Sequence, residues 1–166
     1  MKAIQISAFG GPEVMQYVDL PDPIAAESEI VLEVTAVGIN YADTHQTENS
    51  YLSPQTLPLV PGIEVTGIHE GKRYLASVSS GGYAQKAIAQ KAALIPIPDQ
   101  VTDQQALCML VQGSTAWHLL RTMGSVKPGQ TVIVHAAAGG VGTIAIQLAK
   151  LWGARVIAVT STQSKI

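Results

Sequence analysis

A glycine-rich hexapeptide lies between two segments rich in β-branched residues. It reads Ala137-Ala138-Gly139-Gly140-Val141-Gly142, which matches G-x-G-x-x-G with alanine in the first glycine position. Glycine at 139 lets the backbone approach a ligand, and glycine at 142 lets a helix pack closely on a strand. A helix N-terminus also offers N–H groups to phosphates. The hexapeptide predicts a turn that binds a dinucleotide pyrophosphate, and the alternative is a tight turn without a ligand.

The segments around this turn have the pattern that such a site needs. Residues 131–134 predict a buried strand, 140–152 a helix ended by Gly153, and 155–159 a second strand. A strand, a helix and a strand within about 30 residues predict a βαβ unit with a parallel sheet. The turn therefore opens a helix directly after a strand, where the binding mechanism requires it.

The end of the second strand indicates which dinucleotide is bound. Sites that prefer NAD carry Asp or Glu about 20 residues after the glycines, bonded to the ribose 2′-hydroxyl. Here the chain carries Thr160-Ser161-Thr162, followed by Lys165, and no carboxylate. Small hydroxyls beside a cation suit a 2′-phosphate, which predicts NADPH as the cofactor. The alternative for Lys165 is an ordinary solvated lysine.

The distribution of charge agrees with an anionic ligand. The 166 residues are 47% apolar and only 13% charged. Residues 1–103 hold all twelve acids and five bases, a net charge of −7, whereas 104–166 hold five bases and no acid. Five scattered bases are too sparse for a nucleic-acid surface, so no nucleic-acid partner is expected. The single cysteine, Cys108, excludes an internal disulfide and a four-cysteine zinc site.

The first hundred residues predict a small β-domain. Short strands are predicted at 2–6, 15–20, 29–37, 65–68, 74–78 and 83–88, separated by glycine and proline turns. In the third of these, Ile30, Leu32 and Val34 alternate and predict one buried face. Residues 41–46 predict one helical turn. From about residue 99 the pattern becomes helical, with one helix predicted around 106–111 and a second over 115–123, ended by Gly124.

No membrane partner is expected from this sequence. The longest stretch without a charged side chain, 128–149, contains a glycine-rich middle that suits a strand, a turn and a helix better than a membrane span. The N-terminus lacks the pattern of a signal peptide. With one thiol and no export signal, the predicted location is cytoplasmic.

Five short motifs, in this order along the chain, resemble those of one enzyme family. They are Gly38-Ile39-Asn40-Tyr41-Ala42-Asp43, Val60-Pro61-Gly62-Ile63-Glu64, Gly81-Gly82-Tyr83-Ala84, Gln112-Gly113-Ser114-Thr115-Ala116 and His135-Ala136-Ala137-Ala138-Gly139-Gly140-Val141-Gly142. The chain is similar to the zinc-independent quinone oxidoreductase (zeta-crystallin-like) branch of the medium-chain dehydrogenase/reductase superfamily.

The resemblance implies a mixed fold. A GroES-like catalytic β-domain is expected at 1–100, and connecting helices with the first βαβ unit of an incomplete Rossmann NADP-binding domain at 101–166. It implies an oxidoreductase that transfers hydride from NADPH to a quinone or activated enone, commonly as a homodimer. Zinc-dependent relatives place metal ligands where this chain has Asn40 and Ile63, which supply neither thiolate nor imidazole, so no metal is expected.

The resemblance also assigns candidate site residues. Asn40 and Thr115 would lie near the nicotinamide and the substrate, where Asn40 would hydrogen-bond the substrate carbonyl. Tyr51 would be on the substrate side. The cofactor-binding residues would be Gly139, Gly140 and Val141 at the pyrophosphate, and Ser161, Thr162 and Lys165 at the 2′-phosphate. Asp43 suits a helix start or a hydrogen bond equally well, and Tyr83 suits packing.

A second function class remains open. The segment between Glu64 and Gly81 is shorter than usual in the family, and the sequence ends at Ile166, after the second Rossmann strand. The alternative is therefore a non-catalytic nucleotide-binding or interaction module that needs further chain to be active. An unfinished sheet would expose a strand edge and apolar helix faces, which favour pairing with another chain.

Overall fold

The computed structural model describes residues 1–50 and 53–165. Contacts divide the chain into two compact units, Met1–Leu107 and Cys108–Ile166, which are described separately below. Each unit has its own cluster of buried apolar side chains. The boundary lies near the predicted division at residue 100, which stays a prediction.

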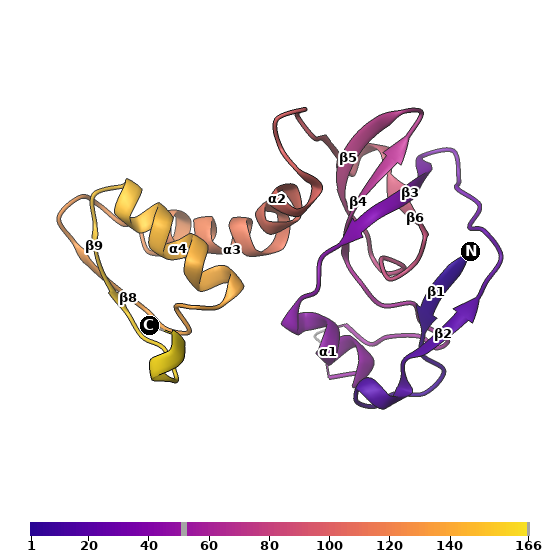
Figure 1. Cartoon of the computed structure of the whole chain (residues 1–166), viewed down its shortest axis with the longest axis horizontal. Helices are drawn as coiled ribbons and strands as arrows, with labels where there is room; N and C mark the ends of the chain where they lie inside the picture. Colours follow the sequence, from indigo (N-terminus) through magenta and orange to yellow (C-terminus); the bar gives the residue numbers. More distant parts are fainter. Residues whose placement is uncertain (51–52, 166) are drawn as a thin grey trace. The chain divides into compact units, whose positions relative to one another are not determined.

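The first unit is built from antiparallel strands (Figure 1). One sheet has the order β6-β3-β4-β5-β7, and β1 pairs separately with β2. The strands are β1 (Lys2–Gln5), β2 (Gln16–Asp19), β3 (Glu29–Val37), β4 (Glu64–His69), β5 (Lys72–Ser77), β6 (Lys86–Gln90) and β7 (Leu94–Pro96). The helical segments are η1 (Pro12–Val14), α1 (Tyr41–Thr47), η2 (Lys91–Ala93) and α2 (Asp103–Cys108), whose last residue belongs to the second unit.

Alternation along β3 forms the core of this unit. Ile30 and Leu32 are buried and Val34 packs against them, which confirms the predicted buried face. The ladder to β4 shifts register between Val34 and Ala36, a β-bulge that bends the strand. After β3 the chain turns at Gly38 and enters α1, so the core positions the start of this helix.

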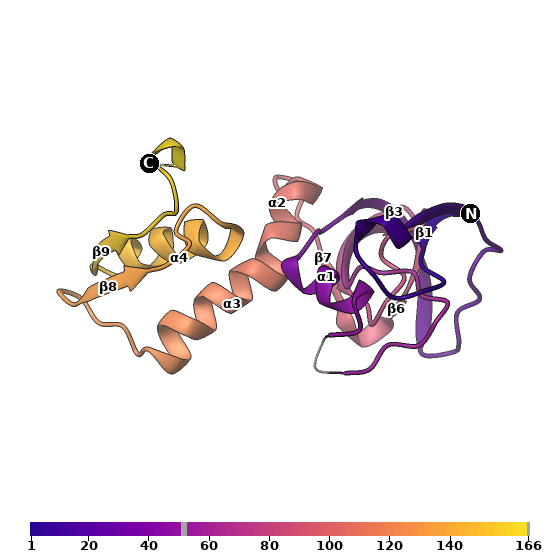
Figure 2. The same ribbon diagram turned by 90° about the horizontal axis from the view of Figure 1, so that it is seen from below.

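The second unit contains the expected βαβ arrangement. β8 (Thr131–Val134) pairs in parallel with β9 (Arg155–Ala158), and α4 (Gly140–Leu151) packs against both (Figures 1 and 2). A short segment, η5 (Gln163–Lys165), follows β9. The buried residues of the core beneath α4 are mostly alanine: Ala116, Leu120, Val126, Val134, Ala137, Ala145, Ala149 and Ala154. Larger, partly buried apolar side chains, among them Ile144, Leu148 and Trp152, pack against them.

The structure corrects two predictions about elements. The two separate helices expected at 106–111 and 115–123 are one helical run, in which π-helical segments η3 (Met109–Gly113) and η4 (His118–Met123) flank α3 (Ser114–Trp117). Gly113 is buried inside this run and does not end it, because close packing there favours the missing side chain. Strand β7 was not predicted, since its three residues include Pro96 and pair only with β5.

One arginine fastens the start of α2 to the sheet. Arg73 on β5 donates to Asp103 Oδ1 at 2.9 Å and to the carbonyls of Pro98 and Val101 at 3.0 Å. Lysine cannot make this set of fixed contacts. We expect Arg73→Lys to lower the free energy of unfolding by about 1–3 kcal/mol in urea denaturation followed by circular dichroism. Arg155→Lys, at an exposed position, supplies the control, and equal stability of both variants would contradict this role.

Candidate functional site

The glycine-rich turn has the geometry of a phosphate site. Gly139 lies directly before α4 in an extended conformation, and the first helical bond runs from the Thr143 N–H to the Gly139 carbonyl at 2.9 Å. The N–H groups of Gly140, Val141 and Gly142 precede this bond, in the position where helix N-termini receive anions. A Cβ built on Gly139 would have one neighbour within 4 Å, the Ala136 carbonyl at 3.2 Å. The approach to the backbone at Gly139 is therefore open.

Gly142 has the opposite surroundings. A Cβ there would lie 2.8 Å from both Cα and the carbonyl oxygen of Ala137, and closer still to the Ala136 carbonyl oxygen. All three atoms belong to the backbone and cannot rotate away. Gly142 thus lets α4 approach the end of β8, as its position in the motif predicts.

The structure brings predicted cofactor residues from both strand ends to one pocket. This pocket, of about 400 Å³, is lined by Ala136, Ala138, Gly139, Val159, Thr160, Ser161 and Lys165. Lys165 Nζ donates to Ser161 Oγ at 3.2 Å, so the ammonium group lies at the pocket wall. Thr162 lies beside it, with its hydroxyl bonded to Ser164, but does not line the pocket. Binding at the carboxyl ends of strands is the general rule for open α/β sheets.

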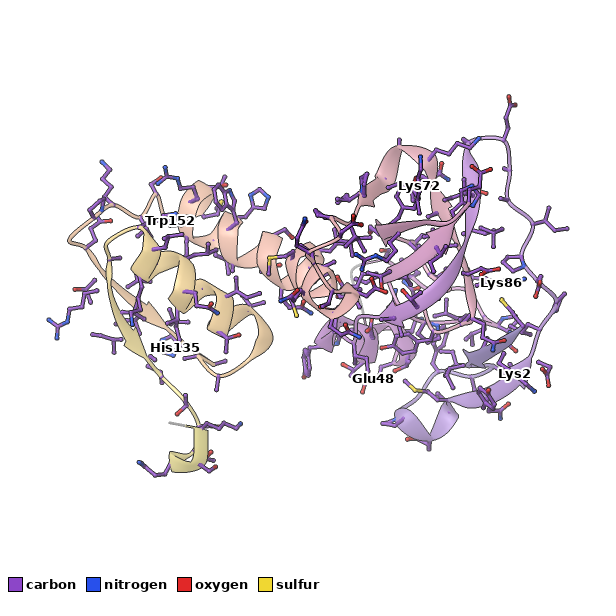
Figure 3. The ribbon with its side chains drawn as sticks, turned by 45° about the horizontal axis from the view of Figure 1, so that its top comes forward. Lys2, Glu48, Lys72, Lys86, His135 and Trp152 are labelled. Atoms are coloured by element: carbon purple, nitrogen blue, oxygen red, sulfur yellow. The ribbon has the colours of Figure 1, made fainter. Side chains whose placement is uncertain are left out.

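A neighbouring pocket surrounds the rest of the turn. It measures about 500 Å³ and includes Gly139, Gly140, Val141 and Gly142 together with His135 and apolar residues of β8 and η4. His135 directly follows β8, on the side of the glycine-rich turn, whereas Trp152 follows the C-terminal end of α4 (Figure 3). The predicted pyrophosphate residues, together with Ser161 and Lys165 of the predicted 2′-phosphate residues, thus line two pockets that share Gly139, whereas Thr162 lines neither.

In the first unit, Asn40 belongs to a buried polar network. Its side-chain nitrogen Nδ2 donates to Glu64 Oε1 at 2.8 Å, and its backbone N–H donates to Asp43 Oδ2 at 2.8 Å. Tyr83 donates its hydroxyl to the same Asp43 oxygen at 2.7 Å. Asn40, Asp43 and Glu64 are 8%, 3% and 0% exposed. The network fixes the start of α1 and holds the Asn40 amide in one orientation.

Glu64 was missed as a site residue by sequence reasoning. It is fully buried at the start of β4, and a Cβ on Gly38 would collide with its carboxylate. Only glycine at the end of β3 leaves room for this side chain. The presence of Glu64 in a family motif was the available signal, but its contact with Asn40, 24 residues away in sequence, depends on the fold.

Burial raises the pKa of the Tyr83 hydroxyl. Burial, the hydrogen bond to Asp43 and the negative charges of Asp43 and Glu64 raise the pKa of its hydroxyl above the ordinary value of 10.0. Below about pH 10 the hydroxyl is neutral in the folded and unfolded chains, so this contribution to stability is fully present. It is lost as the pH rises toward the folded-state pKa, because only the unfolded chain then releases the proton readily.

We therefore expect wild-type stability to fall more steeply above about pH 10 than that of Tyr83→Phe. Thermal unfolding at a series of alkaline pH values measures the difference. Tyr17→Phe removes the hydroxyl of a tyrosine that is 71% exposed, and this control should follow the wild type. Parallel curves for wild type and Tyr83→Phe would contradict the expectation.

The remaining candidate residues for the substrate side are Thr115 and Tyr51. Thr115 is half-buried on α3 in the second unit, whereas Asn40 lies in the first unit, so a shared site stays a prediction. Tyr51 lies outside the described residues. Among the described residues, no group of three or more His, Cys, Asp or Glu side chains could hold a metal ion. Within the same part of the chain, no helix has the length and apolar character to cross a membrane.

Comparison with known proteins identifies the class. No family model matches the chain. Quinone oxidoreductase 1 of Escherichia coli K12 is 37% identical, and quinone oxidoreductase of Lama guanicoe is 34% identical; each match covers 98% of this chain and 53% of the relative. The chain thus spans about half the length of the curated relatives it matches.

Solved structures agree with this comparison. Thermus thermophilus quinone oxidoreductase, described alone and with NADPH, is 42% identical with a TM-score of 0.92, over 100% of this chain and 55% of its own. Escherichia coli quinone oxidoreductase in complex with NADPH is 33% identical with a TM-score of 0.93, over 99% and 54%.

The fold is that of the medium-chain dehydrogenase/reductase superfamily, which confirms the predicted mixed fold class. Within that superfamily, the chain is a homologue of the zeta-crystallin-like quinone oxidoreductases over 98% of its length.

Proposed function

We propose that this chain is part of an NADPH-dependent oxidoreductase that reduces a quinone or an activated enone. The observation that carries the cofactor assignment is the pocket that gathers Gly139, Ser161 and Lys165. The carboxyl ends of β8 and β9 bring the glycine-rich turn and the ammonium group of Lys165 to the same pocket. The relatives crystallised with NADPH support the same assignment.

The residues of the pocket fit the proposed cofactor. Gly139 leaves the turn open on the side where a Cβ would stand, and Gly140 and Val141 direct N–H groups at the start of α4 toward a pyrophosphate. Lys165 and Ser161 would receive the 2′-phosphate by charge-assisted hydrogen bonds, and Thr162 would add a hydroxyl. Residues 104–166 contain no Asp or Glu side chain that would repel these phosphates.

The substrate side is proposed from Asn40, Thr115 and Tyr51. When bound, NADPH supplies the hydride, and the protein supplies position and electrostatics. The Asn40 amide, held by Glu64, is proposed to hydrogen-bond the substrate carbonyl oxygen as negative charge develops there. Because Asn40 and Ile63 are poor zinc ligands, the proposed reaction is zinc-independent. A cytoplasmic homodimer is the proposed state of the protein.

Titration of the whole chain with NADPH and NADH, followed by nucleotide fluorescence, tests the cofactor assignment. We expect NADPH to bind more tightly than NADH. Lys165→Ala should weaken NADPH binding by about tenfold or more, the effect of one charge-assisted hydrogen bond, and leave NADH unchanged. Lys150→Ala, an exposed lysine at the end of α4, is the matched control. Equal affinities for the two nucleotides would refute the 2′-phosphate site.

The second candidate function is a nucleotide-binding module without turnover. It is favoured by the fact that the chain spans about half the length of its relatives. A quinone reduction assay at saturating NADPH separates the two functions. Turnover by this chain alone supports the enzyme, whereas NADPH binding without turnover supports the module.

A further inference from the structure

The side chain of Gln112 lies against the phosphate-binding turn. A Cβ built on Gly140 would meet three atoms of Gln112, at 3.1 Å from Cγ, 3.8 Å from Cδ and 3.9 Å from Cβ. Gly139, the other exposed glycine at the start of the turn, has only a backbone oxygen within the same range. Gln112 therefore lies beside Gly140 in particular and is not among the neighbours of Gly139.

Gln112 lies within a π-helical segment. Within η3, the Ser114 N–H bonds to the Met109 carbonyl, five residues earlier. A turn of this kind holds one residue more than an α-helical turn, and Gln112 is one of the residues inside it. Gly113 permits the tight packing that results, since a Cβ there would lie 3.2 Å from the Cys108 carbonyl oxygen. Such segments often occur at functional sites.

The first turn of α4 consequently has close neighbours from two other segments, the end of β8 and the helical run. Backbone atoms of Ala136 and Ala137 at the end of β8 lie next to the place where a Cβ of Gly142 would be, and Gln112 from the helical run lies next to the corresponding place at Gly140. The N–H groups of Gly140, Val141 and Gly142 belong to this first turn. A turn held in its binding conformation before the ligand arrives loses less entropy on binding.

We propose that Gln112 is a positioning residue that holds the first turn of α4 in the orientation that binds the cofactor pyrophosphate. This inference rests on the proposed NADPH-binding function. Gln112 acts through Gly140 and is not itself assigned a contact with the nucleotide.

Nucleotide titrations with two probes test the proposal on the whole chain. Gln112→Ala should raise the Kd for NADPH about tenfold and leave the Kd for adenosine 2′-monophosphate unchanged, because that probe lacks the pyrophosphate. Gln112→Met keeps the Cγ methylene and should restore most of the NADPH affinity. Gln147→Ala, an exposed glutamine on α4, is the matched control and should bind both probes as the wild type does.

Thermal unfolding gives a second readout that needs no nucleotide. Gly140→Ala places a methyl group against Gln112, whereas in the Gln112→Ala background the same change meets no such neighbour. Alanine also suits a helix better than glycine. We expect Gly140→Ala to raise the Tm by several degrees more in the Gln112→Ala background than in the wild type, since contacting residues are not additive.

The outcomes distinguish a failure of the proposed NADPH-binding function from a failure of the proposed role of Gln112. A wild-type chain that binds no NADPH refutes the proposed function. If the wild type binds, the positioning role is overturned by an unchanged NADPH Kd in Gln112→Ala, or by an equal loss of affinity for both probes, which would indicate general damage. Additive effects on the Tm would show that Gln112 and Gly140 do not interact, and would overturn it as well.

Discussion

Gly142→Ala is expected to unfold the second unit of the protein. The added Cβ would lie within 2.8 Å of Ala137 Cα and of its carbonyl oxygen, and no side-chain rotation can relieve contacts with backbone atoms. Relief requires α4 to move away from β8, which breaks the packing of the alanine core. We expect a loss of about 4 kcal/mol or more, comparable with the whole stability of a unit of this size at about 0.05–0.15 kcal/mol per residue.

Amide NMR spectra of the variant measure this effect separately for the two units. Signals from residues 108–166 should collapse toward unfolded positions, while those of the first unit stay dispersed. Gly139→Ala is the matched control in the same turn, because its Cβ would meet only the Ala136 carbonyl at 3.2 Å. This control should remain folded and bind NADPH more weakly. A dispersed spectrum for Gly142→Ala would contradict the close approach of helix and strand.

Asp43→Ala is expected to have the largest effect in the first unit. Asp43 Oδ2 accepts hydrogen bonds from the Asn40 backbone N–H and from the Tyr83 hydroxyl, and both donors would lose this acceptor in a buried place. Hydrogen bonds to a charged group contribute about 1.5–3 kcal/mol each. We therefore expect the free energy of unfolding to fall by about 3 kcal/mol or more in urea denaturation.

Two further variants test whether the stability lost in Asp43→Ala comes from the unpaired Tyr83 hydroxyl. Tyr83→Phe removes one donor and its bond together, and should be milder than Asp43→Ala. In the double variant the loss should be smaller than the sum of the two, because the Tyr83 donor is no longer stranded. Additive losses would show that the two side chains do not depend on each other.

Local patterns in the sequence predicted most of the residues that line the proposed nucleotide pocket. β-branched strands, the glycine spacing and the hydroxyl-rich segment before Lys165 each carry information over a few residues, and the parallel pairing of β8 and β9 brings them together. Alternation in β3 likewise predicted its buried face. These features depend on period and on turn chemistry, which a single sequence displays.

Contacts between distant residues could not be predicted in the same way. Nothing in the spacing of Asn40 and Glu64 indicates that their side chains meet, because the contact depends on how β3 and β4 pair around a bulge. The continuity of the helical run through Gly113 could not be predicted either, because glycine is unfavourable inside a helix and usually indicates a break. Gln112 was read only as part of a motif, because its neighbour Gly140 is distant in sequence.

The alanine-rich core of the second unit has a consequence for the lifetime of the protein. Alanine side chains bury little apolar area, so each core position contributes less to stability than leucine or isoleucine would. A ligand that binds only the folded unit then supplies a large share of its stability, about 2.7 kcal/mol at a concentration one hundred times its Kd. Proteases that cleave opened chains would remove the nucleotide-free form first. If the chain binds NADPH as proposed, the supply of this nucleotide would therefore affect how much of the protein survives proteolysis.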